Sequence, residues 1–227
     1  MRYVVVDGLD GVGKTTLINN IINRLVERSV PIHKTRAIGG TGDCPYQMAI
    51  RNTVLSNKFP HDKGVLEEGL FALAHIECNR QVQEFLDSNP NGVAIKDRGV
   101  ASNVSYGHGR GFSYDDIMSI HDDPFSLEKR VFSRHGGINL VLLPNKIDLV
   151  MERIERRAKE TGVATQGRLE TLEIQESVFN TMSRLDEIEG LEGLSFHKVY
   201  VDELDSPEDV YQMARAVLFS EGLTLLE

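Results

Sequence analysis

The chain has 227 residues, and 41% of them are hydrophobic, which is enough for one globular domain with a sizeable core. Its 34 acidic residues outnumber its 25 lysines and arginines and give a formal net charge of −9. This balance excludes a protein that coats nucleic acid without regard to sequence, because such binding requires a basic surface.

The first predicted element leads into a glycine-rich loop. Residues 2–16 read RYVVVDGLDGVGKTT, an apolar strand followed by glycines, a lysine and two threonines. Gly8, Gly13, Lys14 and Thr15 match the pattern G-x-x-x-x-G-K-[ST], in which backbone N–H groups surround phosphate oxygens. A helix follows, and its positive end favours phosphate as well. The stretch predicts binding of a nucleoside triphosphate by Gly8, Leu9, Asp10, Gly11, Val12, Gly13, Lys14, Thr15 and Thr16.

Strands and helices alternate along the rest of the chain. The predicted strands cover residues 3–6, 30–35, 93–97, 138–143 and 195–201. The predicted helices cover residues 17–26, 46–57, 65–87, 100–119, 146–159, 168–185 and 207–219. The helix at residues 100–119 is expected to carry glycine interruptions at positions 107, 109 and 111. A polar stretch at residues 121–137 is expected to carry one short helix, and residues 160–166 are expected to form a mobile loop.

This alternation indicates an α/β fold whose parallel sheet is covered by helices on both faces. We expect residues 1–227 to form a single domain. In such sheets, ligands bind beyond the carboxyl ends of the strands. The glycine-rich loop, Arg36, Asp97, Arg98 and Pro144 all follow predicted strand ends. They are therefore expected to converge on one crevice.

Three arginines stand where a phosphate-bearing acceptor could be held. Arg36 follows the second strand, Arg98 follows the third, and Arg168 lies beyond the predicted mobile loop. A guanidinium fork suits phosphate oxygens better than an ammonium group does. The alternative for each is a solvated surface residue or a helix cap. Phosphoryl transfer needs mainly positioning and neutralisation of charge, so no general base is required.

Two carboxylates are predicted to work beside these arginines. Asp97 closes an apolar strand, where a Mg²⁺ ligand is expected, and the Thr15 hydroxyl is the second predicted ligand. The alternative for Asp97 is an N-cap of the next helix. Asp10 brings a negative charge close to bound phosphates, which is costly unless it meets a hydroxyl, a cation or Mg²⁺. A functional placement of Asp10 is therefore predicted.

As a set, five segments give the chain a family resemblance. They are DGLDGVGKTT (7–16), TRAIGGTG (35–42), LFALAH (70–75), DRGVASNVSYG (97–107) and SPEDVYQMARAVL (206–218). The chain resembles the thymidylate kinases, within the nucleoside monophosphate kinases. The resemblance implies the three-layer P-loop kinase fold with a lid, here around residues 160–168. It also implies transfer of the γ-phosphoryl group of ATP, with Mg²⁺, to dTMP or a related deoxynucleoside monophosphate, by a cytoplasmic homodimer.

The resemblance also implies individual roles. Phe71 would stack on the base of the monophosphate, Ser102 and Asn103 would reach the base, and Tyr106 would disfavour a ribose. The arginines at 36 and 98 would hold the acceptor phosphate, and Asp10 would meet the sugar 3′-hydroxyl or the metal shell. The implied acceptor-binding residues are Asp10, Arg36, Phe71, His75, Arg98, Ser102, Asn103 and Tyr106.

The resemblance implies a catalytic arginine in the lid. Some members of the family place this arginine beside the loop aspartate, but here that position is Gly11. The segment GRLE (167–170) is similar to the DRxE of the subgroup that supplies arginines from the lid. The implied catalytic residues are Asp10, Lys14, Arg98 and Arg168.

The chain departs from the family pattern around the acceptor. His75 replaces the arginine expected to contact the base, Gly99 replaces an aromatic residue, and Ala37-Ile38 replaces Glu-Pro. The stretch at residues 121–137 is longer than expected. We hypothesise an altered base pocket, suited to a modified pyrimidine or to several deoxynucleotides. Turnover of dTMP alone would remove this idea.

A second motif favours a different class of protein. Asn145-Lys146-Ile147-Asp148 follows an apolar strand and matches the guanine-binding N-K-x-D of GTPases. Together with the glycine-rich loop, it makes a GTP-binding switch the alternative. Against this reading, no D-x-x-G follows the third strand, and the arginine-bearing loops are left without a role.

Composition also bounds the setting of the protein. Cys44 and Cys78 form neither a disulfide framework nor a metal-ligand spacing, which indicates reduced thiols in the cytoplasm. No apolar run approaches the ~20 residues of a membrane span. The first strand begins near residue 2, so we expect no signal peptide. Partners are therefore expected to be the two nucleotides and a second copy of the chain, with neither nucleic acid nor membrane.

Overall fold

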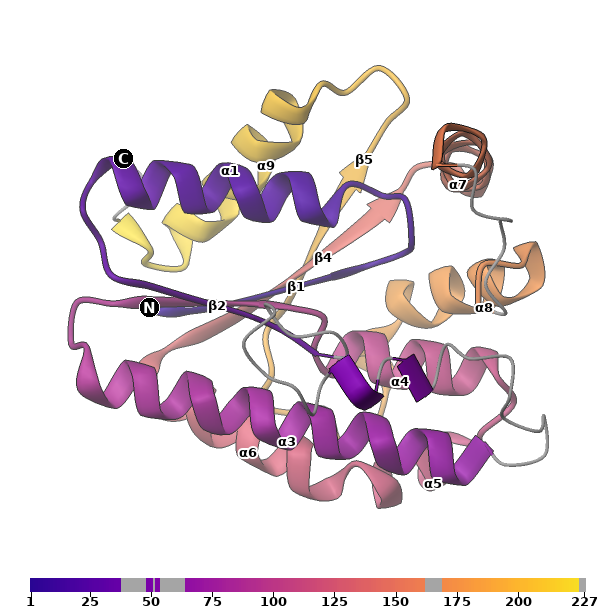
Figure 1. Ribbon diagram of the computed structural model, residues 1–227, viewed down its shortest axis with the longest axis horizontal. Helices are drawn as coiled ribbons and strands as arrows, with labels where there is room; N and C mark the ends of the chain where they lie inside the picture. Colours follow the sequence, from indigo (N-terminus) through magenta and orange to yellow (C-terminus); the bar gives the residue numbers. More distant parts are fainter. Residues whose placement is uncertain (38–47, 51, 54–63, 162–168, 225–227) are drawn as a thin grey trace.

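A computed structural model describes residues 1–37, 48–50, 52–53, 64–161 and 169–224. Its centre is a five-stranded parallel sheet in the order β2-β3-β1-β4-β5 (Figure 1). The strands are β1 (Tyr3–Gly8), β2 (Ile32–Arg36), β3 (Val93–Asp97), β4 (Gly137–Pro144) and β5 (Phe196–Val201). The predicted fold class and all five predicted strands are confirmed, with ends that differ by one or two residues.

Helices cover both faces of this sheet. The long helices are α1 (Lys14–Glu27), α3 (Gly64–Ser88), α6 (Asp122–His135), α7 (Ile147–Thr161), α8 (Leu172–Ser183) and α9 (Pro207–Ser220). Shorter ones are α4 (Val100–Gly109), α5 (Tyr114–Ile120) and a 3₁₀ turn at Leu185–Glu187. Figure 1 shows α1 and α9 on one face, with α3, α4, α5 and α6 on the other. Within the predicted helix at residues 46–57, residues 48–50 and 52–53 are helical, and the others lie outside the described residues.

The middle of the sheet is apolar because both of its faces are covered. Every residue of β1 is buried, and β3 is buried along its whole length. Such continuous runs of valine and isoleucine are typical of parallel strands between two helical layers. All five strands run in one direction. Their carboxyl ends therefore lie at the same edge of the sheet, on the right in Figure 1, near α7 and α8.

The predicted helix at residues 100–119 is in fact two helices. The chain turns at Gly111, whose φ of 94° favours glycine, and α5 then begins after Ser113. The Ser113 hydroxyl accepts a hydrogen bond from the Asp116 N–H at 3.1 Å, which caps the new helix.

The stretch at residues 121–137 carries the 14-residue helix α6 and the first residue of β4, so the prediction of one short helix was wrong in length. Its apolar residues Phe125, Val131 and Phe132 are buried in the main core. Pro124 lies in the first turn, where its missing N–H costs no helical hydrogen bond. This helix therefore completes one layer of the domain.

Helix α6 is tied to the sheet by a buried ion pair. Lys96 of β3 pairs with Glu128 of α6, and both side chains are fully buried. The Lys96 ammonium also donates to Asn79 Oδ1 of α3 at 2.6 Å, and Asn79 Nδ2 donates to the Pro124 carbonyl at 3.0 Å. Helix α6 thus supplies the carboxylate that pairs with Lys96, the residue that precedes Asp97 in strand β3.

Helix α6 also explains why residue 99 is glycine. A Cβ there would lie 2.5 Å from Val5 Cγ1, 2.9 Å from Glu128 Oε1 and 3.1 Å from Asp7 Oδ2. An aromatic side chain built in that direction would enter the core between β1 and α6. The absence of an aromatic residue at this position therefore has a packing reason.

We expect Gly99→Ala to lower the free energy of unfolding by about 1–3 kcal/mol, because the added methyl group overpacks this contact. Chemical denaturation would measure the change. Gly69→Ala on helix α3 is the matched control, since a Cβ at Gly69 would meet no described atom within 4 Å. The control should be neutral or stabilising. Equal stability of both variants would contradict the packing reason.

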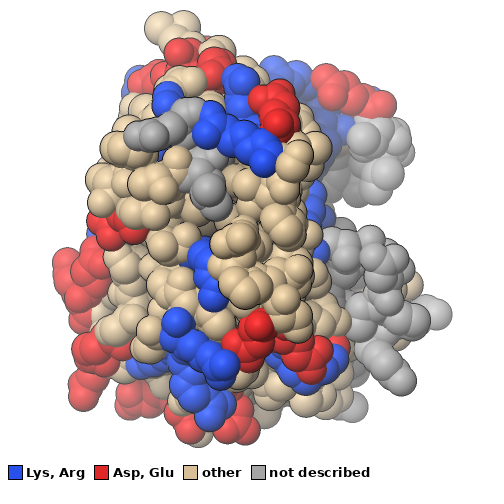
Figure 2. Space-filling view, turned by 90° about the vertical axis from the view of Figure 1, so that its left-hand side faces the viewer, with Lys and Arg blue, Asp and Glu red and all other residues tan. Residues whose placement is uncertain are grey.

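The surface charge, the polarity of the helices and the cysteines bear on the expectations from composition. On the face shown in Figure 2, basic, acidic and uncharged side chains are interspersed. Among the described helices, none combines the length and the apolar character needed to cross a membrane. Cys78 is buried, and its sulfur accepts a hydrogen bond from the Thr35 hydroxyl at 3.3 Å, whereas Cys44 lies outside the described residues.

Candidate functional site

The glycine-rich loop joins the central strand β1 to helix α1. Gly8 has φ 145°, and a Cβ there would lie 2.5 Å from the Leu142 carbonyl oxygen of β4. Gly13, with φ 109°, is the N-cap residue of α1 and has no side chain to cap the helix. The first N–H groups of α1 therefore stand at the mouth of the loop. Thr15 and Thr16 follow in the first turn and are exposed.

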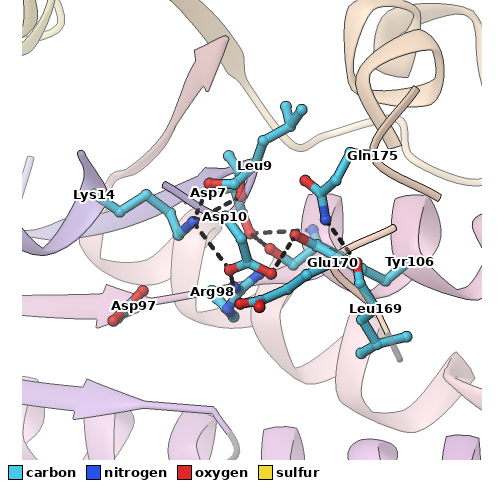
Figure 3. A network of polar contacts seen from close by, with 12 residues as sticks. Asp7, Leu9, Asp10, Lys14, Asp97, Arg98, Tyr106, Leu169, Glu170 and Gln175 are labelled. Carbon is cyan, nitrogen blue, oxygen red and sulfur yellow. Dashed lines mark hydrogen bonds and ion pairs between the residues drawn. The ribbon is translucent and has the colours of Figure 1, made fainter. Parts of the chain in front are cut away.

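Lys14 is folded onto this loop. Its ammonium donates to the Gly8 carbonyl at 2.9 Å and to the Leu9 carbonyl at 2.6 Å, as Figure 3 shows for Leu9. Burial and the nearby Arg98 charge lower the pKa of Lys14 to about 8, against the opposing pull of Asp10. A phosphate group in the loop would raise the pKa of this lysine again and take over its hydrogen bonds.

Helix α7 packs directly against Gly11. A Cβ at this position would lie 3.3 Å from the Val150 carbonyl oxygen and 3.5 Å from Arg153 Cβ. The Arg153 guanidinium reaches the Val12 carbonyl at 3.5 Å. The glycine that replaces the family's loop arginine therefore faces a helix that carries arginines of its own.

Asp10 lies at the centre of a polar cluster beside the loop (Figure 3). It forms an ion pair with Arg98 and accepts a hydrogen bond from the Tyr106 hydroxyl at 3.0 Å. The Arg98 guanidinium also lies 5.1 Å from the centre of the Tyr106 ring. Three residues that the sequence singled out are thus brought together from the loop after β1, the end of β3 and helix α4.

Arg98 has a backbone conformation that is uncommon for a residue with a side chain. Its φ is 72°, in the left-handed region. Its N–H donates to the Val6 carbonyl at 3.0 Å, and the next N–H, of Gly99, donates to Asp7 Oδ1 at 2.8 Å. Strain of this kind persists only where neighbouring contacts hold it, and it is concentrated at functional sites.

The pKa of the Asp10 carboxyl group is lowered by its neighbours, which can be tested. Burial raises its pKa, but Arg98, Lys14 and the Tyr106 hydroxyl outweigh burial and hold it at about 2. A carboxyl group whose pKa is lowered on folding stabilises the protein above its unfolded-state pKa. That stabilisation is lost as the pH falls through the folded-state value. The loss should therefore lie between about pH 4 and pH 2.

We expect Tyr106→Phe to raise the pKa of Asp10, because the variant removes one of the groups that stabilise the carboxylate. Carbon-detected NMR titration of the Asp10 carboxyl group would follow the change. Tyr114→Phe is the matched control, because Tyr114 lies in helix α5 and stacks on His108. An unchanged titration in Tyr106→Phe would contradict the hydrogen bond.

Arg36 and Asp97 meet at the ends of β2 and β3. The Arg36 Nε atom lies 3.4 Å from Asp97 Oδ2, and 38% of the arginine side chain is exposed. Asp97 Oδ1 is buried and has no hydrogen-bond partner among the described residues. Asp97 thus offers a carboxylate oxygen at a strand end, and the exposed Thr15 offers a hydroxyl in the first turn of α1. Both are oxygen ligands of the kind that Mg²⁺ prefers.

Asp7 is a site residue that the sequence reasoning missed. Its Oδ1 atom accepts from the N–H groups of Gly99 and Ser102, at 2.8 and 3.1 Å, and from the Ser102 hydroxyl at 2.5 Å. Burial raises the pKa of Asp7. Asp7 therefore fixes the start of helix α4, and the Ser102 hydroxyl is engaged there. The implied contact between Ser102 and a base stays a prediction.

The remaining acceptor-side residues form a buried group on α3 and α4. Phe71, His75 and Asn103 are 6%, 1% and 6% exposed. Asn103 hydrogen-bonds to His75, and its amide lies 3.4 Å from His121 Nδ1. Burial, with the nearby Lys96 charge, lowers the pKa of His75 well below its usual value. His75 is therefore a neutral imidazole and no direct substitute for an arginine.

The segment after the predicted lid is linked to Asp10 through Tyr106. Arg168 and most of the predicted lid lie outside the described residues. Just beyond them, Gln175 Nε2 donates to the Leu169 carbonyl at 2.7 Å, and the Gln175 amide also contacts Tyr106 (Figure 3). Glu170 pairs with Arg157 of α7. Leu169, Glu170 and Gln175 were not predicted individually, because only the fold brings Gln175 to Tyr106 and Glu170 to Arg157.

The N-K-x-D segment has local roles in the structure. Asn145 donates from its side-chain amide to Asp202 at 2.8 Å, and its N–H bonds to the Val201 carbonyl. Asp148 lies in the first turn of α7, where an acid is favourable at the positive end of the helix. These contacts explain the asparagine and the aspartate without a guanine base.

The sheet order and the glycine loop define a nucleotide-binding α/β protein of the P-loop class. No protein-family model matches the chain. Among curated proteins, the thymidylate kinase of Carboxydothermus hydrogenoformans is 30% identical over 181 residues, which cover 78% of this chain and 80% of that protein. The thymidylate kinase of Symbiobacterium thermophilum is also 30% identical and covers 70% and 73% of the two chains.

Other matches are shorter, and a solved structure agrees in fold. The alignment with the Finegoldia magna thymidylate kinase is 28% identical and spans only 58% of that relative's length. The crystal structure of thymidylate kinase from Ehrlichia chaffeensis has a TM-score of 0.64 at 16% identity, with 96% and 98% of the two chains covered. The chain belongs to the thymidylate kinase family, as its five segments predicted.

Proposed function

We propose that this protein transfers the γ-phosphoryl group of ATP to dTMP. The observation that carries the proposal is the contact of Asp10, inside the phosphate loop, with Arg98 and Tyr106. Asp10 belongs to the loop that is suited to a triphosphate, whereas Arg98 and Tyr106 are suited to a deoxynucleotide. Their contact brings the two groups of residues together. Relatives named thymidylate kinase support dTMP as the acceptor. The single-domain prediction for residues 1–227 belongs to the same proposal.

In this proposal, the loop N–H groups and Lys14 hold the phosphates of ATP. Arg98 and Arg36 hold the phosphate of the acceptor, whose oxygen is already nucleophilic and needs no general base. Lys14, Arg98 and a lid arginine, Arg168, neutralise the charge that develops on the transferred group. Asp10 orients Arg98 and lies close to the sugar. Closure of the lid excludes water and so limits hydrolysis of ATP.

The donor set of Asp97 and Thr15 supports a Mg²⁺ ion in the same site. These two residues would hold the ion, Asp97 through the oxygen atom that has no partner among the described residues. When bound, Mg²⁺ supplies positive charge to the β- and γ-phosphates. Arg36 keeps the Asp97 carboxylate in place at the strand end.

A homodimer and a cytoplasmic location complete the proposal. Helix α3 exposes three apolar side chains, Val65, Leu66 and Leu73, with exposed fractions of 65%, 53% and 59%. Exposed apolar groups gathered on one helix favour association. The chain has only two cysteines, Cys44 and Cys78, and this low cysteine content is compatible with a reducing compartment.

We expect Arg98→Ala to raise the KM for dTMP about 10- to 100-fold, because a charge-assisted contact to the acceptor phosphate is lost. The KM for ATP should change little. Steady-state kinetics with each substrate varied in turn would measure both. Arg184→Ala is the matched control, because this exposed arginine pairs only locally with Glu187 among the described residues. Unchanged KM and kcat for dTMP would remove Arg98 from the acceptor site.

One experiment separates the proposal from a GTP-binding switch. ADP production would be followed with and without dTMP, and ATP and GTP would compete for the loop. A kinase should produce ADP in proportion to the monophosphate added. A strong preference for GTP, with no stimulation by any monophosphate, would overturn the proposal and favour the switch.

A further inference from the structure

A chain of four buried polar side chains leaves helix α3 and returns to it. It begins at Glu68, passes through His121 between α5 and α6 and through Asn103 of α4, and ends at His75. Glu68 and His75 are seven residues apart, so they lie on one face of α3, two turns from each other. In chain order of these contacts, the four residues are 0%, 0%, 6% and 1% exposed.

The first link is the contact between Glu68 and His121. One carboxylate oxygen of Glu68 pairs with Arg110, and the other lies 2.8 Å from His121 Nε2. A carboxylate that pairs with a guanidinium has only acceptors to offer, so the proton of this contact belongs to His121 Nε2. Burial, with the Arg110 charge, lowers the pKa of His121 to about 4, so its ring is neutral at neutral pH. His121 Nδ1 therefore carries no proton.

The second link follows from the first. The Asn103 amide nitrogen lies 3.4 Å from His121 Nδ1. Since this Nδ1 atom can only accept, Asn103 directs its amide N–H toward His121 and its amide oxygen elsewhere. The reverse orientation of the amide would bring two acceptors together. The direction of the Asn103 side chain is thus set by an imidazole whose own proton is set by Glu68.

The last link is the hydrogen bond between Asn103 and His75. Burial lowers the pKa of His75 well below its usual value, but the bond with Asn103 acts in the opposite direction. A bond to the amide oxygen has this effect, because it favours a protonated ring nitrogen. The neutral His75 ring therefore donates from the nitrogen that faces Asn103, and its other nitrogen is an acceptor. A ligand that meets this second nitrogen must offer it an N–H or O–H group.

Packing holds the middle of this chain in place. The His121 ring stacks on Phe125 of α6, with ring centres 5.3 Å apart and 19° between the ring planes. Gly107 lets α4 approach Glu68, since a Cβ there would lie 3.4 Å from Glu68 Oε1 and 3.0 Å from the Ile117 side chain. The His121 ring thus has a fixed plane, and each of its two nitrogens has its own partner.

Resting on the proposed function, we infer that Glu68 and His121 are positioning residues, which fix the Asn103 amide and the tautomer of His75 on the acceptor side of the site. Each N–H along the chain points toward Glu68. Neither positioning residue touches the monophosphate in this arrangement. Side chains that are ordered in advance lose less freedom on binding, so the effect belongs in the KM for the monophosphate.

Nitrogen-15 NMR of the imidazole rings tests the chain in the wild type, without any substitution. At neutral pH, the correlations between ring protons and ring nitrogens should show His121 as the Nε2–H tautomer. They should show His75 as a single tautomer. A proton on His121 Nδ1, or a mixture of the two tautomers at His75, would overturn the inference.

His121→Phe removes both ring nitrogens but keeps a ring that can stack on Phe125. We expect His75 to become a mixture of tautomers, because the Asn103 amide is then free to turn over. The KM for dTMP should rise about 3- to 10-fold, the size of one neutral hydrogen bond, while the KM for ATP stays the same. His121→Gln keeps an N–H for Glu68 and a carbonyl oxygen for Asn103. It should therefore recover part of the loss.

His33→Phe is the matched control. His33 of β2 also stacks on a phenylalanine, Phe85, with ring centres 5.3 Å apart. Phe85 lies near the other end of α3 from Glu68. The control should change neither the tautomer of His75 nor the KM for dTMP. Thermal unfolding of each variant would verify that it is folded.

The outcomes separate this inference from the proposed function. If His121→Phe leaves the KM for dTMP unchanged, or raises the KM for both substrates equally, His121 is structural and the inference is wrong. The kinase proposal then still stands. Absence of turnover with every monophosphate would instead overturn the proposed function, and the positioning role would fall with it.

Discussion

Lys14→Ala should lower kcat for phosphoryl transfer by about 10³-fold while the protein stays folded, because one positive charge at the transferred group is lost. Among the described residues, this lysine bonds to the Gly8 and Leu9 carbonyls and lies 4.0 Å from Asp10, all within the loop itself. Its side chain thus supports no distant part of the fold. The effect should appear in kcat, with a smaller change in binding of ATP.

The control for this prediction is Lys34→Ala. Lys34 lies on strand β2 and donates to Asn19 at 3.2 Å on the surface. It should leave kcat unchanged, and both variants should unfold within a few degrees of the wild type. Turnover close to the wild-type rate in Lys14→Ala would contradict the assignment of the phosphate loop.

Breaking the buried pair of Lys96 and Glu128 should destabilise the protein by about 3–5 kcal/mol, because one charge is then left buried without its partner. Glu128→Leu leaves the Lys96 ammonium among apolar groups and Asn79. A loss of this size is a large share of the ~5–15 kcal/mol that holds a typical domain together. Urea denaturation followed by circular dichroism would measure it.

The double variant Lys96→Met/Glu128→Leu provides the decisive comparison. Removing both charges also removes the cost of burying them, so this variant should recover most of the stability lost in the single one. If the double variant is no more stable than Glu128→Leu, then the pair is not the source of the effect. Helix α6 would then be held by its apolar contacts alone.

The three central strands, β3, β1 and β4, were predictable from the sequence because they are buried on both faces. Runs such as Val4-Val5-Val6 in β1 carry the signal within a few adjacent residues. The phosphate loop was equally clear, since its glycines, lysine and threonine lie within eight positions. The start of α9 at Ser206 followed from a capping box with Asp209, which the structure contains.

Helix α6 was harder to predict for physical reasons. Its many charged residues mask a narrow apolar face, and Asp122-Asp123-Pro124 resembles a helix break. The proline is tolerated because it lies in the first turn. The break between α4 and α5 was masked in a similar way, since Gly107 and Gly109 are helical whereas Gly111 is not. The Ser113-x-x-Asp116 cap was the available signal.

The site could be predicted only where residues follow strand ends. Asp10, Arg98 and Tyr106 were singled out by motif, and the structure brings them into contact. Asp7 and Gln175 gave no such signal, because their contacts join segments up to 95 positions apart, as between Asp7 and Ser102. Such pairs arise from the packing of α3 and α4 beside the loop, which local sequence patterns do not specify.

The most direct test of the account is an acceptor panel. The purified protein would be given ATP and Mg²⁺ with dTMP, dUMP, dCMP, dGMP or dAMP, and the products would be identified by mass. We predict formation of dTDP and ADP in equal amounts, with dTMP among the best acceptors. Absence of any nucleoside diphosphate from the acceptors, with ATP still bound by the loop, would contradict the assignment as a nucleoside monophosphate kinase.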